Sequence, residues 1–339
     1  MANQHKASTL PQKHGKLEVG TRTTPIPHGK QALVKVTAAA INPLDWKVID
    51  YGFFVDKFPA VLGIDGAGII HAVGREVTGF QVGDRVLFQG SYDPVDQAAY
   101  QEYAIVETDV IAKVPSHVND DQASTIPTCA ITAYYGLFQR TGISPPLSGP
   151  TASDKSVLIL GGSSSVGQFA IQLARIAGFS TVVTTASSQH AGFLKSLGAT
   201  HVLDRNTDVK TIQSAFVTPV SLVLDTISVE STQLLAFDVL ATPSPVPGTR
   251  IGLLLPPVDS LSEKNSGDKV IVDQVLGSSY MFMDVSVPFW QKVGEWVEKG
   301  ELVPNRVQLV KGGLAGIPEA LDLSRKGVSG VKLVIRPQE

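Results

Sequence analysis

Strands and helices alternate from residue 155 onwards, and this alternation constrains the fold more than any other feature of the sequence. The strands are short, continuous apolar runs, which is typical of strands covered on both faces of a parallel sheet. Parallel strands joined by helices require right-handed crossovers. The pattern therefore predicts an α/β fold with a doubly wound parallel sheet. The expected strands are SVLIL, STVVTT, ATHVLD, VSLVLDT and GTRIGLLL.

The first of these strands enters its helix through a turn rich in glycine and serine. Gly161 and Gly167 can take the places of the first and third glycines of a dinucleotide-binding fingerprint, and the hydroxyl of Ser164 could donate to a phosphate between them. A plain strand-to-helix connection also favours glycine and serine, so this alternative stays open. The residues expected to hold a phosphate are Gly161, Gly162, Ser163, Ser164, Ser165, Val166 and Gly167.

The end of the second strand indicates which nucleotide is bound. NAD sites place an acid there for the ribose 2′-hydroxyl, but the segment TTASSQH, 184–190, contains none, and the first acid is Asp204. Small and basic residues surround this position, which favours a 2′-phosphate and therefore NADPH over NADH. These residues are Ser187, Ser188, His190, Lys195 and Arg205, and each could instead be ordinary surface.

The rest of the chain has a different pattern of expected strands and helices. Residues 31–115 alternate as strands punctuated by Gly, Pro and Asp, which predicts a β-rich domain, and residues 120–140 predict a helix that breaks or starts at Pro127. Residues 256–269 predict a surface loop. Beyond it we expect a strand GSSYMFM, a helix, a strand RVQLV, a second helix and a last strand VKLVIRP, which return to the β-rich domain.

Composition excludes several classes of protein. The net charge of −3 and the absence of a Lys/Arg stripe argue against nucleic-acid binding. Cys129 is the only cysteine, so no internal disulfide can form. The polar start of the chain and the lack of an apolar run of about 18 residues predict neither a signal peptide nor a membrane span. We therefore expect a cytoplasmic protein.

Several stretches together resemble the medium-chain dehydrogenase/reductase superfamily along nearly the whole chain. They are AAAINPLDWKV, FPAVLGIDGAGIIHAVGREVTGFQVGDRVL, IPTCAITAYYGL, the glycine turn, LGATHVLD and GIPEALDLSRKGVSGVKLV. The resemblance implies a GroES-like catalytic domain over residues 1–125, a Rossmann NADPH-binding domain over 126–275, and a C-terminal segment over 276–339 that completes the first domain.

The sequence departs from the zinc-dependent alcohol dehydrogenases of this superfamily. Those enzymes carry a catalytic cysteine, a Gly-His-Glu motif and a lobe with four cysteines. Here Asn42 stands in the run Asn-Pro-Leu-Asp, the second motif reads Gly63-Ile64-Asp65, and the lobe is missing. One cysteine cannot build a four-thiolate site, and the seven histidines show no ligand pairing. We therefore expect no metal.

The chain is more similar to the zinc-free branch, which includes quinone oxidoreductases, alkenal reductases and the fungal enoyl reductases that act in trans with polyketide synthases. This resemblance implies transfer of a hydride from NADPH to the conjugated C=C of an enone, an enal or an enoyl thioester. A quinone reductase and a catalytically silent NADPH-binding protein remain alternatives. A monomer and a homodimer are both compatible, and a carrier-bound polyketide is a further candidate substrate.

The resemblance also assigns residues. Asn42, Asp45 and Trp46 are expected near the nicotinamide, Lys47 at the substrate carbonyl or at the phosphate of an acidic carrier, and Thr132 beside the nicotinamide ring. A surface strand lysine is the alternative for Lys47, and an ordinary helix-face residue is the alternative for Thr132. Tyr51 is the first candidate proton donor, with Tyr92, Tyr135 and water as alternatives. The other expected cofactor contacts are Thr226 at the ribose, the backbone of Leu253, Leu254, Gly277 and Ser278 at the carboxamide, and Lys332.

Overall fold

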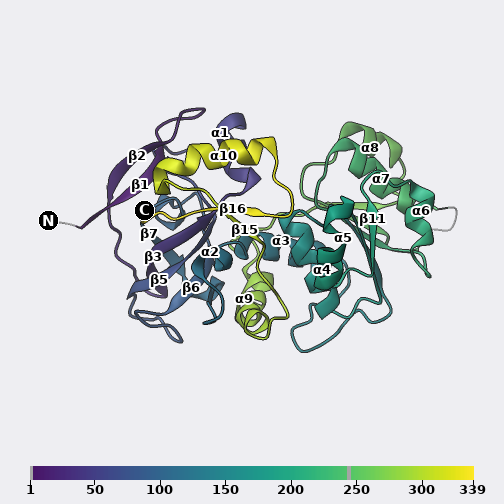
Figure 1. Ribbon diagram of the computed structural model, residues 1–339, viewed down its shortest axis with the longest axis horizontal. Helices are drawn as coiled ribbons and strands as arrows, with labels where there is room; N and C mark the ends of the chain where they lie inside the picture. The colour runs from purple at the N-terminus through teal and green to yellow at the C-terminus, as the bar shows by residue number, and fades with distance from the viewer. Residues whose placement is uncertain (1–2, 243–245) are drawn as a thin grey trace. The chain divides into compact units, whose positions relative to one another are not determined.

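A six-stranded parallel sheet is the framework of one of the two units into which the chain divides. The computed structural model describes residues 3–242 and 246–339. Unit 1 comprises Met1–Thr128 and Ser279–Glu339, and unit 2 comprises Cys129–Ser278. The chain therefore passes between the two units twice, from Thr128 to Cys129 and from Ser278 to Ser279 (Figure 1).

The sheet of unit 2 has the strand order β11-β10-β9-β12-β13-β14, and each neighbouring pair is parallel. Its strands are β9 (Ser156–Leu160), β10 (Thr181–Ala186), β11 (His201–Asp204), β12 (Leu222–Asp225), β13 (Arg250–Leu253) and β14 (Ile271–Gln274). The helices are α3 (Pro127–Phe138), which starts in unit 1, α4 (Ser165–Ile176), η3 (Ser188–His190), α5 (Ala191–Leu197), α6 (Val209–Ser214), α7 (Glu230–Leu240) and α8 (Asp259–Lys264).

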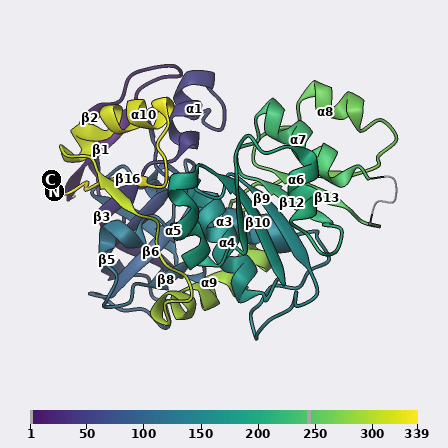
Figure 2. The same cartoon turned by 45° about the vertical axis from the view of Figure 1, so that its right-hand side comes forward.

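Helices cover both faces of this sheet, because the strands are apolar on both sides. Leu158 and Val223 belong to one buried cluster with side chains of α6, α7 and α8. The neighbouring Leu224 points to the other face, where it lies against Gly136 of α3. Figure 2 shows the strands of this sheet together with their helices. The predicted doubly wound fold class is confirmed.

Unit 1 is rich in β-structure. A seven-stranded sheet runs in the order β15-β16-β3-β5-β6-β8, with β7 also paired to β3, and a smaller sheet has the order β2-β1-β4. The strands are β1 (Gln4–Leu10), β2 (Glu18–Thr23), β3 (Gln31–Ala40), β4 (Ala60–Val61), β5 (Asp65–Val73), β6 (Arg85–Gln89), β7 (Tyr103–Glu107), β8 (Ile111–Lys113), β15 (Val307–Leu309) and β16 (Lys332–Ile335).

Helices border these sheets. They are α1 (Pro43–Tyr51), η1 (Val95–Gln97), η2 (Thr108–Val110), α2 (Asp120–Ala123), α9 (Met283–Glu298), η4 (Gly313–Gly316) and α10 (Ile317–Lys326). Helices α1 and α10 lie side by side in both views, and Arg325 forms a two-pronged ion pair with Asp50 between them (Figures 1 and 2). Helix α9 packs on β8 and η2.

Two local predictions were wrong. The run GSSYMFM forms no strand among the described residues; the sheet instead ends with β14, whose Ile271 pairs with Arg250 of β13. Met281 is 60% exposed, so the apolar pattern of this run does not reflect burial in a sheet. The segment 256–269, predicted as a loop, contains α8, which packs on α7 through the buried Leu261.

Candidate active site

The glycine turn, residues 161–167, joins β9 to the twelve-residue helix α4 in unit 2. Gly161 has a φ of +82°, which other residues rarely adopt. A Cβ on Gly162 would lie 2.1 Å from Thr184 Oγ1, and one on Gly167 would lie 2.3 Å from the carbonyl oxygen of Gly161. Only glycine fits these two positions without a shift of the neighbouring atoms, so the turn is shaped for close backbone approach.

Two backbone N–H groups of this turn already donate hydrogen bonds within the protein. Gly161 donates to Thr185 Oγ1 and Gly162 to the Thr185 carbonyl, at 3.2 and 3.0 Å, which ties the turn to β10. Ser165 and Val166 occupy the first turn of α4, where helix geometry offers their N–H groups no carbonyl four residues back. These two amides, at the positive end of the helix dipole, are the donors suited to a phosphate.

Ser164 caps the helix that follows the turn. Its Oγ accepts the N–H of Gly167 at 2.9 Å, so it is the N-cap of α4. Ser164 Oγ also lies 2.8 Å from Thr226 Oγ1, whose own proton is directed to the carbonyls of Leu160 and Gly161. The Ser164 hydroxyl is therefore bonded within the turn to the Gly167 N–H and to Thr226.

The residues predicted around a 2′-phosphate differ in exposure. Ser188, Lys195 and Arg205 are exposed, Ser187 is half-buried, and His190 is only 8% exposed. Asp204, the last residue of β11, lies opposite Ala186, the last residue of β10, and its Oδ1 accepts the N–H of Asn206 at 2.9 Å.

A second group of predicted residues comes together in unit 2. Thr132 of α3 is 7% exposed, and a Cβ on Gly277 would lie 1.8 Å from its Oγ1, so the backbone of Gly277 packs directly on this hydroxyl. Tyr135 donates its hydroxyl proton to the Ser278 carbonyl at 3.3 Å, which uses the proton of one alternative acid. Leu253 is fully buried at the end of β13, and the Leu254 amide donates to Ser228 Oγ at 2.8 Å.

In unit 1, the predicted residues near Lys47 lie on a helix that the sequence analysis did not anticipate. Asn42 is the N-cap of α1, Pro43 is its first residue, and the Asp45 carboxylate accepts the Asn42 N–H at 2.7 Å. An Asn-Pro-x-Asp run is a recognisable helix start, so this signal could have been used. Lys47 is therefore a helical residue, whereas a strand lysine had been the alternative.

The side chains of α1 differ in surroundings. Lys47 is half-buried, burial lowers the pKa of its ammonium, and its Nζ lies 5.6 Å from the centroid of the Trp46 ring. Tyr51 is 62% exposed at the end of the helix, where it stacks on Phe53 with 6.0 Å between the ring centroids. An exposed hydroxyl can exchange its proton with solvent, so Tyr51 remains chemically competent as a proton donor.

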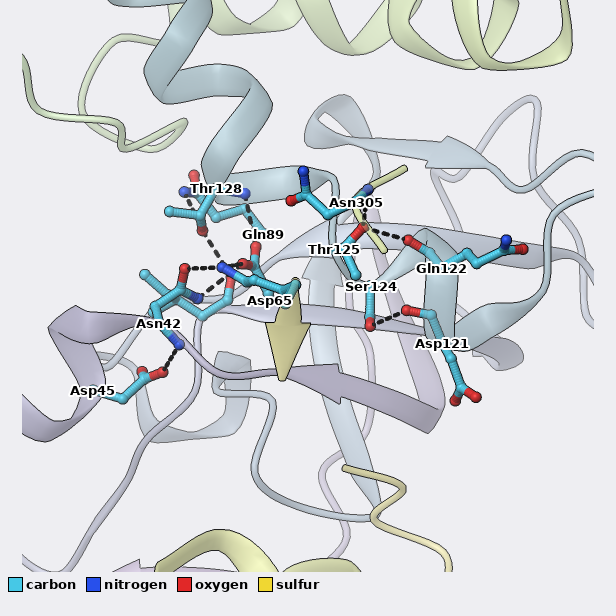
Figure 3. Close-up of polar contacts among 12 residues, drawn as sticks. Asn42, Asp45, Asp65, Gln89, Asp121, Gln122, Ser124, Thr125, Thr128 and Asn305 are labelled. Atoms are coloured by element: carbon cyan, nitrogen blue, oxygen red, sulfur yellow. Dashed lines mark hydrogen bonds and ion pairs between the residues drawn. The ribbon is translucent and has the colours of Figure 1, made fainter. Parts of the chain in front are cut away.

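The start of α1 belongs to a buried polar cluster, which we define as Asn42, Asp45, Asp65 and Lys332 with Tyr92 and Tyr100. Asn42 Nδ2 donates to Asp65 Oδ2 at 2.8 Å, and Lys332 Nζ donates to Asn42 Oδ1 at 2.6 Å. Lys332 Nζ also lies 3.6 Å from Asp65 Oδ2. Asp65 is fully buried and the other two are 4% exposed. Figure 3 shows Asn42 between Asp45 and Asp65.

Strand register explains how Lys332 reaches this cluster. Val334 of β16 pairs with Ala40 of β3, and Ile41 donates its N–H to the Leu333 carbonyl at 2.9 Å. Lys332 therefore falls beside Asn42, the next residue of the chain after Ile41. The ammonium predicted to contact the cofactor is held inside unit 1 by these bonds.

Asp45 is the most perturbed carboxyl group of the cluster. Its Oδ1 accepts the Tyr92 hydroxyl at 2.9 Å and its Oδ2 accepts the Tyr100 hydroxyl at 2.7 Å. Burial raises the pKa of Asp45 to about 6, although the Asn42 amide and the two tyrosine hydroxyls oppose this shift. Burial and the Asp45 carboxylate also raise the pKa of both tyrosines well above 10. Tyr92, an alternative proton donor, therefore holds its proton firmly while Asp45 is ionised.

Family models match both units. The model of the alcohol dehydrogenase GroES-like domain matches residues 28–116, and that of the zinc-binding dehydrogenase matches residues 165–243. A trans-enoyl reductase of Aspergillus flavipes is 32% identical over 99% of both chains. The chain belongs to the medium-chain dehydrogenase/reductase superfamily.

A second relative supports this assignment, and a solved structure shares the fold. A trans-enoyl reductase of Aspergillus japonicus is 32% identical over 94% of this chain and 93% of its own. The crystal structure of an alcohol dehydrogenase superfamily protein from Novosphingobium aromaticivorans has the same fold, with a TM-score of 0.80 and 24% identity over 98% and 99% of the two chains. The predicted family is confirmed, and the chain is an oxidoreductase.

Membership in the medium-chain dehydrogenase/reductase superfamily implies a nicotinamide cofactor. The glycine turn fits such a group for two reasons. A Cβ at Gly162 would collide with Thr184, so the backbone there carries no side chain, and the N–H groups at the start of α4 can donate to a phosphate. Within residues 3–242 and 246–339, no three His, Cys, Asp or Glu side chains gather in a group able to hold a metal ion. Among the described helices, none has the length and apolar character needed to cross a membrane.

Sequence reasoning missed two members of this region. Tyr100 bonds to Asp45, and Gln89 bonds to residues near Asp65. Neither residue stands in a run with a motif of its own. The pairing of β5 with β6 sets Gln89 opposite Asp65, and the N–H of Tyr100, which donates to the Leu62 carbonyl at 2.9 Å, places that tyrosine.

Proposed function

We propose that this oxidoreductase is a zinc-independent, NADPH-dependent reductase of the conjugated C=C in α,β-unsaturated carbonyl compounds, either enones and enals or enoyl thioesters. The observation that carries the proposal is the polar cluster of unit 1. At the position where the resemblance expects a catalytic cysteine, the Asn42 amide is bonded to Asp65 and Lys332, and Ile64 is buried at the expected histidine position. A self-contained cluster of this kind offers no vacant ligand set.

The similarity along almost the full chain to two trans-enoyl reductases supports the proposed reaction. NADPH, when bound, supplies the hydride that adds to the β-carbon. The chain's own groups then act on the carbonyl end of the substrate. The Lys47 ammonium donates a hydrogen bond to the carbonyl oxygen on which negative charge develops. Tyr51 or water delivers a proton to the α-carbon, which completes the saturated product.

Unit 2 would hold the cofactor through backbone groups. Ser165 and Val166 would donate their N–H groups to the pyrophosphate, and Gly277 would bring backbone close to the carboxamide beside Thr132. The preference for NADPH rests on the exposed Lys195 and Arg205 near the end of β10, where the segment 184–190 offers no carboxylate.

The test is a screen of NADPH oxidation against enals, enones, quinones and enoyl thioesters, each with and without a metal chelator. We expect turnover of unsaturated carbonyls, no loss with chelator and a lower KM for NADPH than for NADH. Enoyl thioesters on a carrier protein, compared with their free analogues, show whether a carrier-bound polyketide is the substrate. Turnover of alcohols alone, with a requirement for zinc, would overturn the proposal.

The same screen separates the alternatives. Exclusive reduction of quinones, with semiquinone radicals detected, would indicate a quinone reductase, and tight NADPH binding with no turnover would indicate a silent binding protein. Lys47→Met should lower kcat/KM for the unsaturated carbonyl about 100-fold with the NADPH dissociation constant unchanged. The exposed Lys16→Met serves as the matched control and should change neither. Unchanged kcat/KM in Lys47→Met would remove Lys47 from the mechanism.

The proposal also places the protein in the cytoplasm, where NADPH is supplied, as a monomer or a homodimer. Cell fractionation tests the location, and size-exclusion chromatography with light scattering tests the assembly state.

A further inference from the structure

Gln89 and Asp65 face each other across the antiparallel pair of strands β5 and β6 in unit 1. Gln89 is 3% exposed and Asp65 is fully buried. A buried amide or carboxylate without partners costs about 1–3 kcal/mol, so such groups persist where their bonds are made. The partners of this pair therefore indicate what it does.

Gln89 bonds to two segments that are far apart in the sequence. Its Oε1 accepts the N–H of Ser279 at 2.7 Å, and its Nε2 donates to Thr128 Oγ1 at 3.0 Å. The Gln89 carbonyl also accepts the hydroxyl of Tyr280 at 2.9 Å. One residue of β6 thus holds the chain at both Thr128 and Ser279–Tyr280.

These two segments are the covalent connections of unit 2. Thr128 is the last residue of unit 1 before the chain enters unit 2, and Ser279 is the first residue after the chain returns. Asp65 strengthens the first connection, because its Oδ1 accepts the Thr128 N–H at 2.7 Å (Figure 3). Both connections are therefore tied to one cross-strand pair.

The same pair is tied to the start of α1. Asp65 Oδ2 accepts from Asn42, the N-cap of the helix that carries Lys47. Within unit 1, a continuous chain of hydrogen bonds therefore runs from Asn42 through Asp65 to Thr128, and on through Gln89 to Ser279. The second connection is fixed further by Trp290 of α9, whose Nε1 donates to Ser279 Oγ at 2.9 Å.

We propose that Gln89 is a positioning residue for hydride transfer. It anchors both connections of unit 2 to the strand pair that also anchors α1, the helix that carries Lys47. The proposal rests on the proposed function, since it assumes a cofactor in unit 2 and a substrate at Lys47. Transfer between two bound groups is steeply sensitive to placement, because a misplacement of about 1 Å can cost 100-fold in rate.

The decisive variant is Gln89→Met, which keeps the length of the side chain and removes both of its hydrogen bonds. We expect kcat to fall about tenfold or more, with the NADPH dissociation constant unchanged, and the isotope effect from deuterated NADPH to rise as hydride transfer becomes limiting. Gln89→Glu keeps an acceptor for Ser279 and an acceptor for the Thr128 hydroxyl, so it should restore part of kcat.

The matched control is Gln101→Met. Gln101 is also fully buried in unit 1, but its amide bonds to the carbonyls of Val95 and Ala98 and to neither connection. We expect Gln101→Met to lower Tm while kcat and the isotope effect stay within twofold of the parent protein. A merely structural role of Gln89 would make the two variants alike, with Tm lowered and kcat kept, and that result would overturn the proposal.

If Gln89→Met does not fold, Thr128→Val is the deciding variant. It removes the bond from Gln89 Nε2 together with the 3.4 Å bond from Thr128 Oγ1 to the Ile64 carbonyl, and it keeps the bond between Gln89 and Ser279. It should lower kcat in the same direction and by less, and an unchanged kcat would also overturn the proposal. An independent readout is the emission of Trp290, which should change in Gln89→Met and not in Gln101→Met. If the parent protein turns over no unsaturated carbonyl, the proposed function fails instead, and the Trp290 emission still tests whether Gln89 orders the connection.

Discussion

The glycine turn of unit 2 and the polar cluster of unit 1 are built from different parts of the chain. The turn uses backbone amides of one contiguous segment, and its two close approaches involve Gly162 and Gly167, where no side chain fits. The cluster uses side chains of distant segments, and its central ion pair joins Asp65 to Lys332. Space is therefore the critical quantity in the turn, and the identity of each bonding partner is critical in the cluster.

This difference has a consequence for substitutions. A turn made of backbone should respond to the size of a new side chain and hardly to its charge. In a cluster of charged side chains, the loss of one partner should lower stability more than the loss of both. An unpaired buried charge destabilises the folded protein more than the absence of both charges does.

Lys332→Met should cause the largest loss of stability, about 3–5 kcal/mol, because it leaves the fully buried Asp65 side chain without its ion-pair partner. The double variant Lys332→Met with Asp65→Asn should recover part of this loss. Urea unfolding measures both. If the loss of stability in the double variant equals the sum of the losses in the two single variants, the two charges act independently. The proposed difference between the cluster and the turn would then be wrong.

Asp45 should make stability fall as pH rises through the weakly acidic range. Burial raises its folded pKa from 3.8 to about 6, so between these values the folded protein keeps a proton that the unfolded chain releases. The free energy of unfolding should therefore drop by up to about 3 kcal/mol across this window and level off above it.

The variant Asp45→Asn isolates this contribution, because it does not titrate. Urea unfolding from about pH 4 to about pH 7 should show the variant gaining on the parent protein as pH rises, in addition to a constant offset from the altered bonds to Tyr92 and Tyr100. Parallel curves for the two proteins would show that Asp45 is ionised throughout.

Gly162→Ala should lower stability by about 1–3 kcal/mol, because the new methyl group meets Thr184 Oγ1. It should also weaken NADPH binding about tenfold or more, which fluorescence titration measures. Gly192→Ala is the control: this glycine lies in α5, nothing lies within 4 Å of its Cβ, and alanine there should add about 0.5–1 kcal/mol. Equal effects of the two alanines would show that space is not critical in the turn.

The smallest effect is expected from exposed cations. Lys195→Ala combined with Arg205→Ala should raise the KM for NADPH about tenfold and leave that for NADH unchanged, since each charged hydrogen bond to a phosphate contributes modestly. Initial rates with both cofactors measure this. An equal rise for NADH would place both residues away from the 2′-phosphate.

The two regions also differ in how far sequence could predict them. The alternation of strands and helices predicted the doubly wound sheet, because the apolar run of each strand itself indicates that the strand is buried. The glycine turn is readable for the same reason, since its residues are neighbours in sequence. Even there, the bond between Ser164 and Thr226, 62 residues apart, could not be foreseen from the sequence.

The cluster could be predicted only in part. Asn42 and Lys332 were singled out by resemblance, but their direct bond spans 290 residues and depends on the register of β16 against β3. Gln89 carries no local signal, because a glutamine at the end of a strand is unremarkable until its partners are known. The helix α1 was missed although Asn42, Pro43 and Asp45 encode its start.

The position of β16 affects the order in which the protein can fold during synthesis. Strand β16, Lys332–Ile335, lies between β15 and β3, so β3 is completed by residues translated about 290 positions later. Unit 2 is one contiguous segment and can fold once it has left the ribosome. The sheet of unit 1 must wait with the second half of β3 unpaired on that side, which makes this edge the place where the nascent chain needs protection.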